Sequence, residues 1–438
     1  MDLDNLDTFR IATCDLNGQM RGKRMPQKDQ RKLASGDLRM PLSVLNVDIW
    51  GADIINSPLL FASGDGDGYL LPTNRGPVPM PWLDQPSALV GMWMFEEDGR
   101  PFEGDPRHAL AQILDRYAAR GWQVVAATEL EFYLIDDSAE SLRPPKDPAS
   151  NRKIDSSAIL SLQQLDAFEA FFSELYQSCA QMGINAQAAS SEAGIGQFEI
   201  SLQHGDALRI ADDTWLFKTL LKGLARKHGY AASFMAKPYP NDAGNGLHLH
   251  FSVIDEAGEN IFDDGTKQGS PLLQNAIAGC LATMRAATLG FAPHANSYTR
   301  MDPENHAPTS ICWGYENRTA ALRIPAGAHR ARRIEHRVAG GDINPFLTLS
   351  LILGAALLGI EDDLTPPPPI TGNAYSQDLP QLIHSWSEAI DMFENDPMIA
   401  RILPAKLIEN FSLTKRQELD GLKNIPQEEH WKTYLETV

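Results

Sequence analysis

The sequence predicts an α+β protein with a small β-rich part at residues 1–104 and a larger part at residues 105–438. Three observations support this prediction. Residues 1–104 consist of short apolar stretches separated by Gly, Pro and Asp, which favour strands and turns. Asp105-Pro106 has the pattern of a helix start. Beyond it, amphipathic helices alternate with strands in which apolar and polar residues strictly alternate.

Length, charge and cysteine content limit the classes of function that fit this chain. The chain has 438 residues, of which 43% are hydrophobic, enough for a sizeable core. A net charge of -19 argues against the basic surface that nucleic-acid binding needs, so we expect small-molecule partners and no nucleic acid. The four cysteines are widely separated and show neither zinc-ligand spacing nor a disulfide framework. We expect them to be reduced and buried.

No segment predicts export or membrane insertion. The N-terminal segment MDLDNLDTFR is acidic and polar, whereas a signal peptide is basic and then apolar. The longest apolar run, from Phe346 to Ile360, is shorter than the roughly 20 residues that span a bilayer, and it contains Thr348 and Ser350. We expect this run to be a buried core helix. The sequence therefore predicts a cytoplasmic protein with no membrane partner.

Helices are predicted at three further places in the larger part. Asp105 and Pro106 supply an N-cap and a proline at the first helical position, and this helix ends before Gly121. Apolar residues at helical spacing then predict a helix over 165–179 that stops near Gly183, and another over 208–224 that stops before Gly229.

Acidic residues occupy the polar faces of two predicted strands. Over 128–134, apolar residues share one face, and Glu129 and Glu131 share the other. Over 197–202, Glu199 has the same position, and Glu192 precedes it across a glycine-containing turn. A solvent-exposed strand face is the commoner explanation for one such segment alone.

Three further predicted strands carry histidine and arginine. The strand 247–252 places His248, His250 and Ser252 opposite a clean apolar face. A lone histidine is more often a satisfied core group than a ligand, but two at this spacing make the alternatives about equal. The strand 333–337 aligns Arg333, Glu335 and Arg337, and a strand over 317–323 contributes Arg318 and Arg323.

This combination of side chains predicts phosphoryl transfer assisted by divalent metals. Five glutamates gathered in one cleft could not all remain ionised unless cations neutralised them. Carboxylate oxygens with an imidazole suit Mg²⁺ or Mn²⁺ better than zinc, and arginines suit phosphate and carboxylate groups. Neither the GxxxxGK[ST] nor the GxSxG pattern occurs, so a P-loop kinase and an α/β-hydrolase are unsupported.

In order along the chain, the motifs resemble those of the glutamine synthetase family. They are Asp15 to Arg24, Pro81-Trp82, the ELEF segment at Glu129, GQFE at Gly196, FMAKP at Phe234, the HxH strand, Asn296 to Arg300, Asn317-Arg318 and Arg333 to Arg337. The resemblance covers nearly the whole chain. It implies an N-terminal β-grasp domain and a catalytic domain with a curved antiparallel sheet covered by helices on its outer side.

The resemblance also implies roles for individual residues. One metal is expected on Glu131, Glu192 and Glu199, and a second on Glu129, His248 and Glu335. Glutamate is expected at Gly244, Arg300 and Arg337, and ATP at His250, Ser252, Arg323 and Arg333. Arg318 matches the arginine at the transferring phosphoryl group.

The reaction of the family explains these expected roles. ATP phosphorylates the γ-carboxylate of glutamate, and an amine then attacks the γ-glutamyl phosphate. The same resemblance implies a homododecamer of two stacked hexamers with active sites between subunits.

Two departures from glutamine synthetases bear on the choice of amine. Ala243 stands where bacterial glutamine synthetases usually have asparagine, and His306 stands where the family has the glutamate of its ammonium site. Both changes resemble the γ-glutamylpolyamine synthetase branch, which implies a primary amine or polyamine as acceptor. His306 is then either the base that deprotonates the amine or a spacer in the flap, with equal weight. An ammonia-using glutamine synthetase and a non-catalytic structural or sensing relative are the alternatives.

Overall fold

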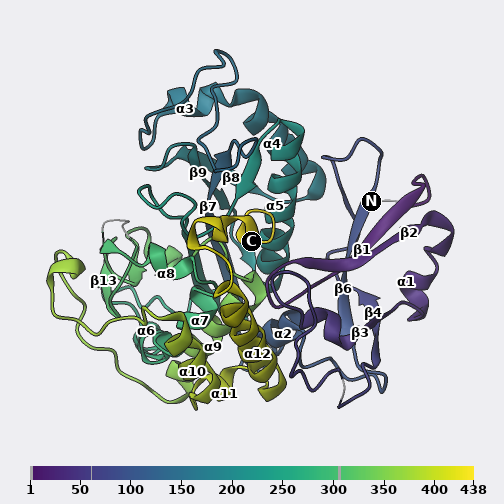
Figure 1. The fold of residues 1–438 in the computed structure, drawn as a ribbon. Coiled ribbons are helices and arrows are strands. Elements are labelled where there is room, and N and C mark those ends of the chain that lie inside the picture. Colours follow the sequence, from purple (N-terminus) through teal and green to yellow (C-terminus); the bar gives the residue numbers. More distant parts are fainter. Residues whose placement is uncertain (1–2, 61, 304–306) are drawn as a thin grey trace.

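Two β-sheets organise the chain in the computed structural model, which describes residues 3–60, 62–303 and 307–438. Figure 1 shows the N-terminal sheet, in purple to blue, on one side of the molecule, and the larger sheet with its helices on the other. The predicted α+β class is confirmed.

Six strands within the described residues form the N-terminal sheet, in the order β2-β1-β6-β4-β3 with β5 paired to β6. The antiparallel pair β1 and β2 comes first in the chain, and the last strand, β6, then lies parallel to β1. This is the arrangement implied for the β-grasp part. The strands are β1 (Thr8–Cys14), β2 (Met20–Pro26), β3 (Arg39–Pro41), β4 (Asp67–Pro72), β5 (Val78–Pro79) and β6 (Ala88–Phe95).

The larger sheet has nine strands among the residues that the structure describes, in the order β13-β14-β15-β12-β7-β9-β8, with β10 and β11 also paired to β7. Its pairs are antiparallel except for β13 with β14. The strands are β7 (Gln123–Ile135), β8 (Ala186–Ser191), β9 (Gln197–Leu202), β10 (Gly205–Asp206), β11 (Ala231–Ser233), β12 (Leu247–Ile254), β13 (Trp313–Tyr315), β14 (Leu322–Ile324) and β15 (Ile334–His336).

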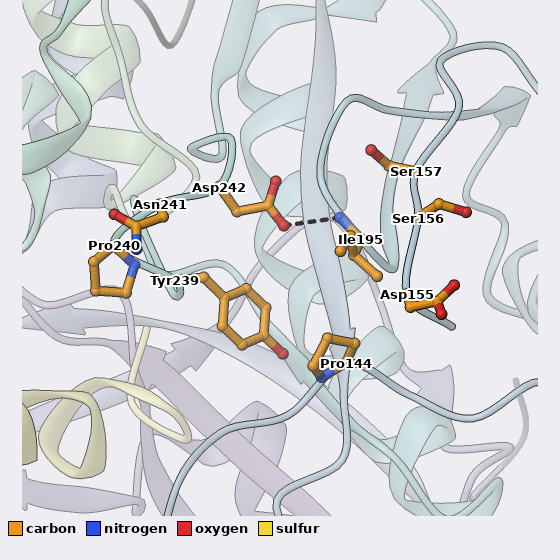
Figure 2. Close-up of a pocket in the computed structure, with 9 residues that line it drawn as sticks. All are labelled: Pro144, Asp155, Ser156, Ser157, Ile195, Tyr239, Pro240, Asn241 and Asp242. Atoms are coloured by element: carbon orange, nitrogen blue, oxygen red, sulfur yellow. Dashed lines mark hydrogen bonds between the residues drawn. The ribbon is translucent and has the colours of Figure 1, made fainter. Parts of the chain in front are cut away.

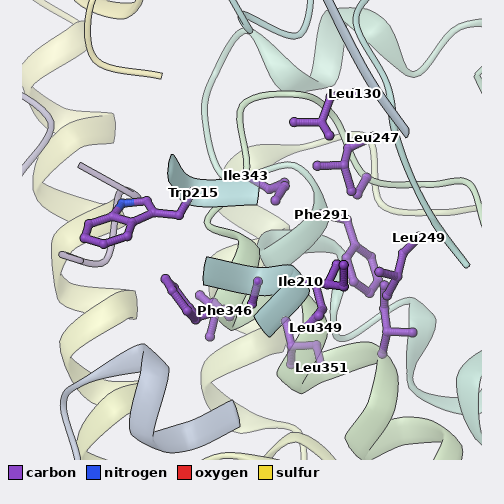
Figure 3. Close-up of a cluster of buried hydrophobic side chains, with 14 of the residues drawn as sticks. Leu130, Ile210, Trp215, Leu247, Leu249, Phe291, Ile343, Phe346, Leu349 and Leu351 are labelled. Carbon is purple, nitrogen blue, oxygen red and sulfur yellow. The ribbon is translucent and has the colours of Figure 1, made fainter. Parts of the chain in front are cut away.

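Helices cover the apolar face of this larger sheet. Figure 3 shows Leu130 of β7 and Leu249 of β12 in one cluster with Phe291 and Phe346 from the helical layer. The principal helices are α2 (Pro106–Ala118), α4 (Glu169–Met182), α5 (Ala207–Lys227), α6 (Pro271–Met284), α9 (Pro345–Glu361), α10 (Trp386–Asn395) and α12 (Ala405–Leu422). Shorter ones are α1 (Lys32–Ser35), α3 (Leu162–Ala167), α7 (Thr288–Phe291), α8 (Ser297–Arg300), α11 (Ile399–Ile402) and α13 (His430–Tyr434).

Most predicted helices are confirmed. Asp105 caps α2 by accepting a hydrogen bond from the amide of Arg107, and Pro106 occupies its first turn. Helix α9 is buried almost throughout, as expected for a core helix. In the described part of the chain, no helix is long and apolar enough to cross a bilayer. The predicted boundary between residues 104 and 105 falls in the connection between β6 and α2, and the boundary itself stays a prediction.

Two element predictions need correction. The helix expected over 165–179 is interrupted at Phe168, which separates α3 from α4 and packs its buried ring against Phe198 and Tyr230. The strand expected over 317–323 is confined to β14, at Leu322–Ile324. The side chain of Asn317 accepts hydrogen bonds from the backbone amide and the hydroxyl of Thr319, so the preceding residues form a turn.

Candidate active site

Strand β7 supplies the centre of the candidate site. Leu130, Phe132 and Leu134 are fully buried on the helix side of the sheet. Glu129 and Glu131 therefore share the opposite face, as predicted from the strict alternation of the sequence.

Antiparallel pairing brings residues from the neighbouring strands onto the same face. Glu131 of β7 lies opposite Glu199 of β9, and Glu129 lies opposite His248 of β12. Directly opposed side chains have Cβ atoms about 4.5–5.5 Å apart. The strand register alone therefore places an imidazole and three carboxylates side by side.

The site continues across β15 and β14. His250 of β12 lies opposite Glu335 of β15, which in turn lies opposite Arg323 of β14. The guanidinium of Arg323 is 2.6 Å from a carboxylate oxygen of Glu335, and Arg337 forms an ion pair with the other oxygen. Arg333 donates a hydrogen bond to Nδ1 of His250 at 3.3 Å. Glu335 is thus surrounded by cationic and imidazole groups.

Glu129 joins two groups of potential metal ligands. Its carboxylate oxygens lie 3.2 Å from Nδ1 of His248 and 3.1 Å from Nε2 of His250. Burial raises the pKa of Glu129, but the bonds from both histidines outweigh burial and hold that pKa well below its ordinary value. The ligand atoms of Glu129, Glu199 and His248 lie within 4.8 Å of one another, and so do those of Glu129, His250 and Glu335.

These two groups divide the ligands differently from the expected sets. The structure combines Glu129 with Glu199, which were expected on different metals, and places His250, expected at ATP, beside Glu129. The assignment of particular residues to particular ions stays a prediction.

The raised pKa values of Glu192 and Glu199 indicate an excess of negative charge in the site. Burial, followed by the nearby carboxylates of Glu131 and Glu129, raises the pKa of Glu199 to about 9. Burial and Glu131 raise the pKa of Glu192 to about 7, against a lowering effect of Arg318. Such carboxylates remain ionised together only if cations neutralise them. This hard oxygen-rich set with imidazole fits Mg²⁺ or Mn²⁺.

Two of the residues expected at glutamate, Gly244 and Arg300, come together, and the charge of the third, Arg337, acts on Arg300. Arg300, at the end of α8, is buried and donates a hydrogen bond to the carbonyl oxygen of Val338 at 2.9 Å. The backbone of the loop before β12 approaches it closely: a Cβ on Gly244 would lie 2.7 Å from Cγ of Arg300. A Cβ built on Gly246 would lie 2.8 Å from Nη2 of Arg300 and 3.3 Å from a carboxylate oxygen of Glu131. Neither glycine has room for a side chain.

Two predicted catalytic residues remain to be placed. Arg318 is exposed in the turn before β14, and its charge acts on the pKa of Glu192. Arg318 therefore lies on a turn rather than a strand, near the acidic face. We use this name for the side of the larger sheet that carries Glu129, Glu131, Glu199 and Glu335, with Glu192 beside it. His306 lies outside the described residues. Ser252 lies two residues beyond His250 on the same face of β12, further from Glu129 in the strand register.

Sequence reasoning missed two residues that shape the site. Tyr133 follows Glu131 by two positions on the cleft face of β7, and its hydroxyl donates to the carbonyl oxygen of Ala243 at 2.7 Å. Gln197 donates from its amide to the carbonyl oxygen of Gly244 at 2.9 Å. The alternation of β7 and β9 places both on the polar faces, which was the signal available in the sequence.

Comparison with known proteins identifies related chains. The family model described as "glutamine synthetase, catalytic domain" matches residues 103–434. Gamma-glutamylputrescine synthetase PuuA of Escherichia coli (strain K12) is 35% identical over 420 residues, covering 95% of this chain and 89% of that protein. Glutamate–isopropylamine ligase of a Pseudomonas species is 31% identical, covering 99% and 96%. The solved structure described as GmaS without ligand superposes with a TM-score of 0.84 at 28% identity, covering 99% and 97%.

Proposed function

The chain belongs to the glutamine synthetase family, and we propose that it is an ATP-dependent ligase that joins the γ-carboxylate of L-glutamate to a primary amine or polyamine. One observation carries the proposal. Carboxylates and imidazoles from β7, β9, β12 and β15 converge on one face of the larger sheet, beside a buried arginine and a close-packed glycine loop. The relatives named above include ligases of glutamate with alkyl amines.

The acidic face would hold two divalent ions. The proposed ligands are Glu129, Glu131, Glu192, Glu199, His248 and Glu335, with His250 close enough to Glu129 to contribute. When bound, Mg²⁺ or Mn²⁺ neutralises charge on the β- and γ-phosphates of ATP and helps to align them with the acceptor oxygen. The raised pKa values of Glu192 and Glu199 support a cation requirement at this position.

Arginines near this face would bind glutamate and ATP, the first two substrates. We assign the carboxylates and amino group of glutamate to Arg300, Arg337 and the backbone at Gly244, which lies against Arg300. We assign ATP to the other end, where Arg323 and Arg333 approach Glu335 and His250. The residues proposed for ATP are His250, Ser252, Arg323 and Arg333.

The reaction then has two steps. An oxygen of the glutamate γ-carboxylate attacks the γ-phosphorus of ATP, the bond to the ADP oxygen breaks, and γ-glutamyl phosphate forms. Arg318 stabilises the negative charge that spreads over the phosphoryl oxygens. The amine nitrogen next attacks the γ-carbonyl carbon, the bond to the phosphate oxygen breaks, phosphate leaves, and the nitrogen loses a proton. His306 is the proposed base, and a spacer role is the alternative.

Two features favour an alkyl amine over ammonia. His306 replaces the glutamate that the family uses at its ammonium site, and Ala243 replaces the usual asparagine. The alternative, an ordinary glutamine synthetase, is supported by a relative of that name in Thermus thermophilus at 30% identity. A non-catalytic relative is the other alternative, and the retention of all six proposed metal-ligand positions argues against it.

Phosphate release from ATP with glutamate and Mg²⁺ tests this proposal. The acceptors are ammonia, methylamine, isopropylamine, ethanolamine, putrescine and spermidine. We expect an alkyl amine or polyamine to give the highest kcat/KM. Ammonia as the best acceptor would establish the glutamine synthetase alternative, and no release with any acceptor would establish the non-catalytic one. In the same assay H306A should lose the acidic limb of the pH profile, because protonation of a catalytic base is what lowers the rate at low pH. An unchanged profile makes His306 a spacer.

We further propose a homododecamer of two stacked hexamers in the cytoplasm, with active sites between subunits. Free, buried cysteines at all four positions are consistent with a reducing compartment. Sedimentation analysis should give a native mass twelve times that of the 48.3 kDa chain. A monomer would contradict the assembly without affecting the residues assigned above.

A further inference from the structure

A cavity of about 500 Å³ lies beside the acidic face. Figure 2 shows its wall, in which the segment 239–242 and the segment 155–157 lie on either side of Ile195. Ile195 belongs to the turn between Glu192 and Glu199, so one wall of the cavity connects two of the proposed metal ligands.

The cavity begins where the carboxylate face of β7 ends. Tyr133 is the next residue on that face after Glu131, and the charges of Glu131 and Asp242 both act on its hydroxyl. That hydroxyl donates to the carbonyl oxygen of Ala243, and its ring meets the ring of Tyr239 edge to face at 5.4 Å. Tyr239 and Asp242 line the cavity. A molecule in the cavity therefore lies next to the proposed glutamate site.

The side chains that line the cavity suit a cation that can donate hydrogen bonds. Asp155 and Asp242 are both present, and none of the described lining residues is lysine or arginine. The hydroxyl of Tyr239 is shielded from solvent and has no hydrogen-bond partner within the described chain. The volume is in the range of small-molecule sites, about 300–1,000 Å³, and exceeds what ammonium needs.

The two carboxylates differ in their availability. Both oxygens of Asp242 already accept backbone hydrogen bonds, from Ile195 and Ala243, each at 2.9 Å. Asp155 is exposed at the rim, and within the described residues its carboxylate has no hydrogen bond or ion pair. Asp155 is therefore the carboxylate free to pair with a ligand.

We propose that this cavity binds the distal ammonium group of an α,ω-diamine, with Asp155 as the residue that selects it. This inference rests on the proposed ligase function, because the other end of the diamine must reach the γ-glutamyl phosphate. The attacking nitrogen reacts as the neutral amine, whereas the distal nitrogen, with a pKa near that of lysine, stays protonated. A monoamine of equal length offers Asp155 no charge, so Asp155 distinguishes the two acceptors.

The test compares 1,4-diaminobutane with butylamine as acceptors in the phosphate-release assay. In wild type the diamine should have the higher kcat/KM. D155N should lower kcat/KM for the diamine about fivefold, the upper end of the effect of an exposed ion pair, and leave butylamine unchanged. The preference should also decline as salt is raised.

The matched control is E140Q, which removes an exposed carboxylate of the same region that does not line the cavity. It should leave both acceptors unchanged. Equal diamine-to-butylamine ratios in wild type and D155N would overturn the role of Asp155, while turnover of butylamine would leave the ligase function standing. Absence of phosphate release with either amine, and with ammonia, would instead remove the ligase function and this inference together. Thermal unfolding of both variants establishes that they are folded.

Discussion

Two buried clusters of ionisable groups in this protein have opposite charge balance. At the junction of the N-terminal part and α12, Lys415 and Glu418 are 0% and 1% exposed and pair at 2.9 Å. Asn17 from the N-terminal part donates to Glu418 at 2.8 Å and accepts from Lys415. This junction cluster is neutral and internally bonded. On the acidic face, by contrast, Glu192 and Glu199 have neighbours of their own sign.

The difference separates a structural cluster from a functional one. A buried pair in which each charge has its partner stabilises the arrangement that contains it, although its net contribution can be small. A buried group of like charges destabilises the protein that carries it until an external cation binds. Removal of one member should therefore have opposite effects on stability at the two places.

The largest expected effect is at the junction cluster. Lys415→Met leaves Glu418 buried without its partner, and the free energy of unfolding should fall by about 3–5 kcal/mol, measured by urea denaturation. The matched control is Lys423→Met, which breaks an exposed pair with Asp420 at the same i,i+3 spacing. Its cost should be below about 1 kcal/mol. Similar costs for the two variants would show that the junction cluster has no special role.

Glu199→Gln should have the reverse pattern. It removes a proposed metal ligand while keeping the shape of the side chain, so phosphate release should fall about a hundredfold, as for other disturbed metal sites. In metal-free buffer the variant should be at least as stable as wild type, because a repulsive charge is gone. Full activity, or a large loss of metal-free stability, would assign Glu199 to a structural role.

The third prediction concerns pH. The pKa of Glu199 is raised from 4.5 to about 9, so the folded protein holds this proton more tightly than the unfolded chain does. The stabilisation from this proton is complete at pH values below the pKa of Glu199 in the unfolded chain. It is lost as the pH rises towards the pKa of Glu199 in the folded protein. Metal-free wild type should therefore lose resistance to urea between about pH 5 and pH 9, and the loss per pH unit should be smaller in Glu199→Gln or with Mg²⁺. If the free energy of unfolding depended on pH equally in wild type and Glu199→Gln, the proposed excess of negative charge around Glu199 would be contradicted.

Much of the site followed from local patterns. Strict alternation placed Glu129 and Glu131 on one face of β7 and Glu199 on one face of β9, and the structure confirms both. The alternation works because successive side chains of a strand point to opposite sides, and a buried face tolerates few polar groups. The capping of α2 by Asp105 is equally local, and it was predicted correctly.

Other features depend on contacts between distant segments. The approach of His250 to Glu129 requires the register of β12 against β7, which no single strand determines. The interruption at Phe168 reflects packing against Phe198 and Tyr230, which overrides the helical spacing around it. A turn forms at Asn317 because its side chain accepts a hydrogen bond from the backbone amide of Thr319 and so competes with strand pairing. Asparagine is a turn signal in the sequence, but the strand-like pattern of the neighbouring residues outweighed it in the prediction.

The sequence by itself determined which side chains face the cleft, because strand and helix periodicities are properties of neighbouring residues. It also determined the family, through motifs kept in order along the chain. The tertiary structure decided how those side chains are grouped: Glu129 lies between two histidines, Asp155 and Asp242 line one cavity, and Lys415 contacts Asn17. Each grouping joins segments far apart in the chain, and only packing of the sheets and helices sets their separation in space.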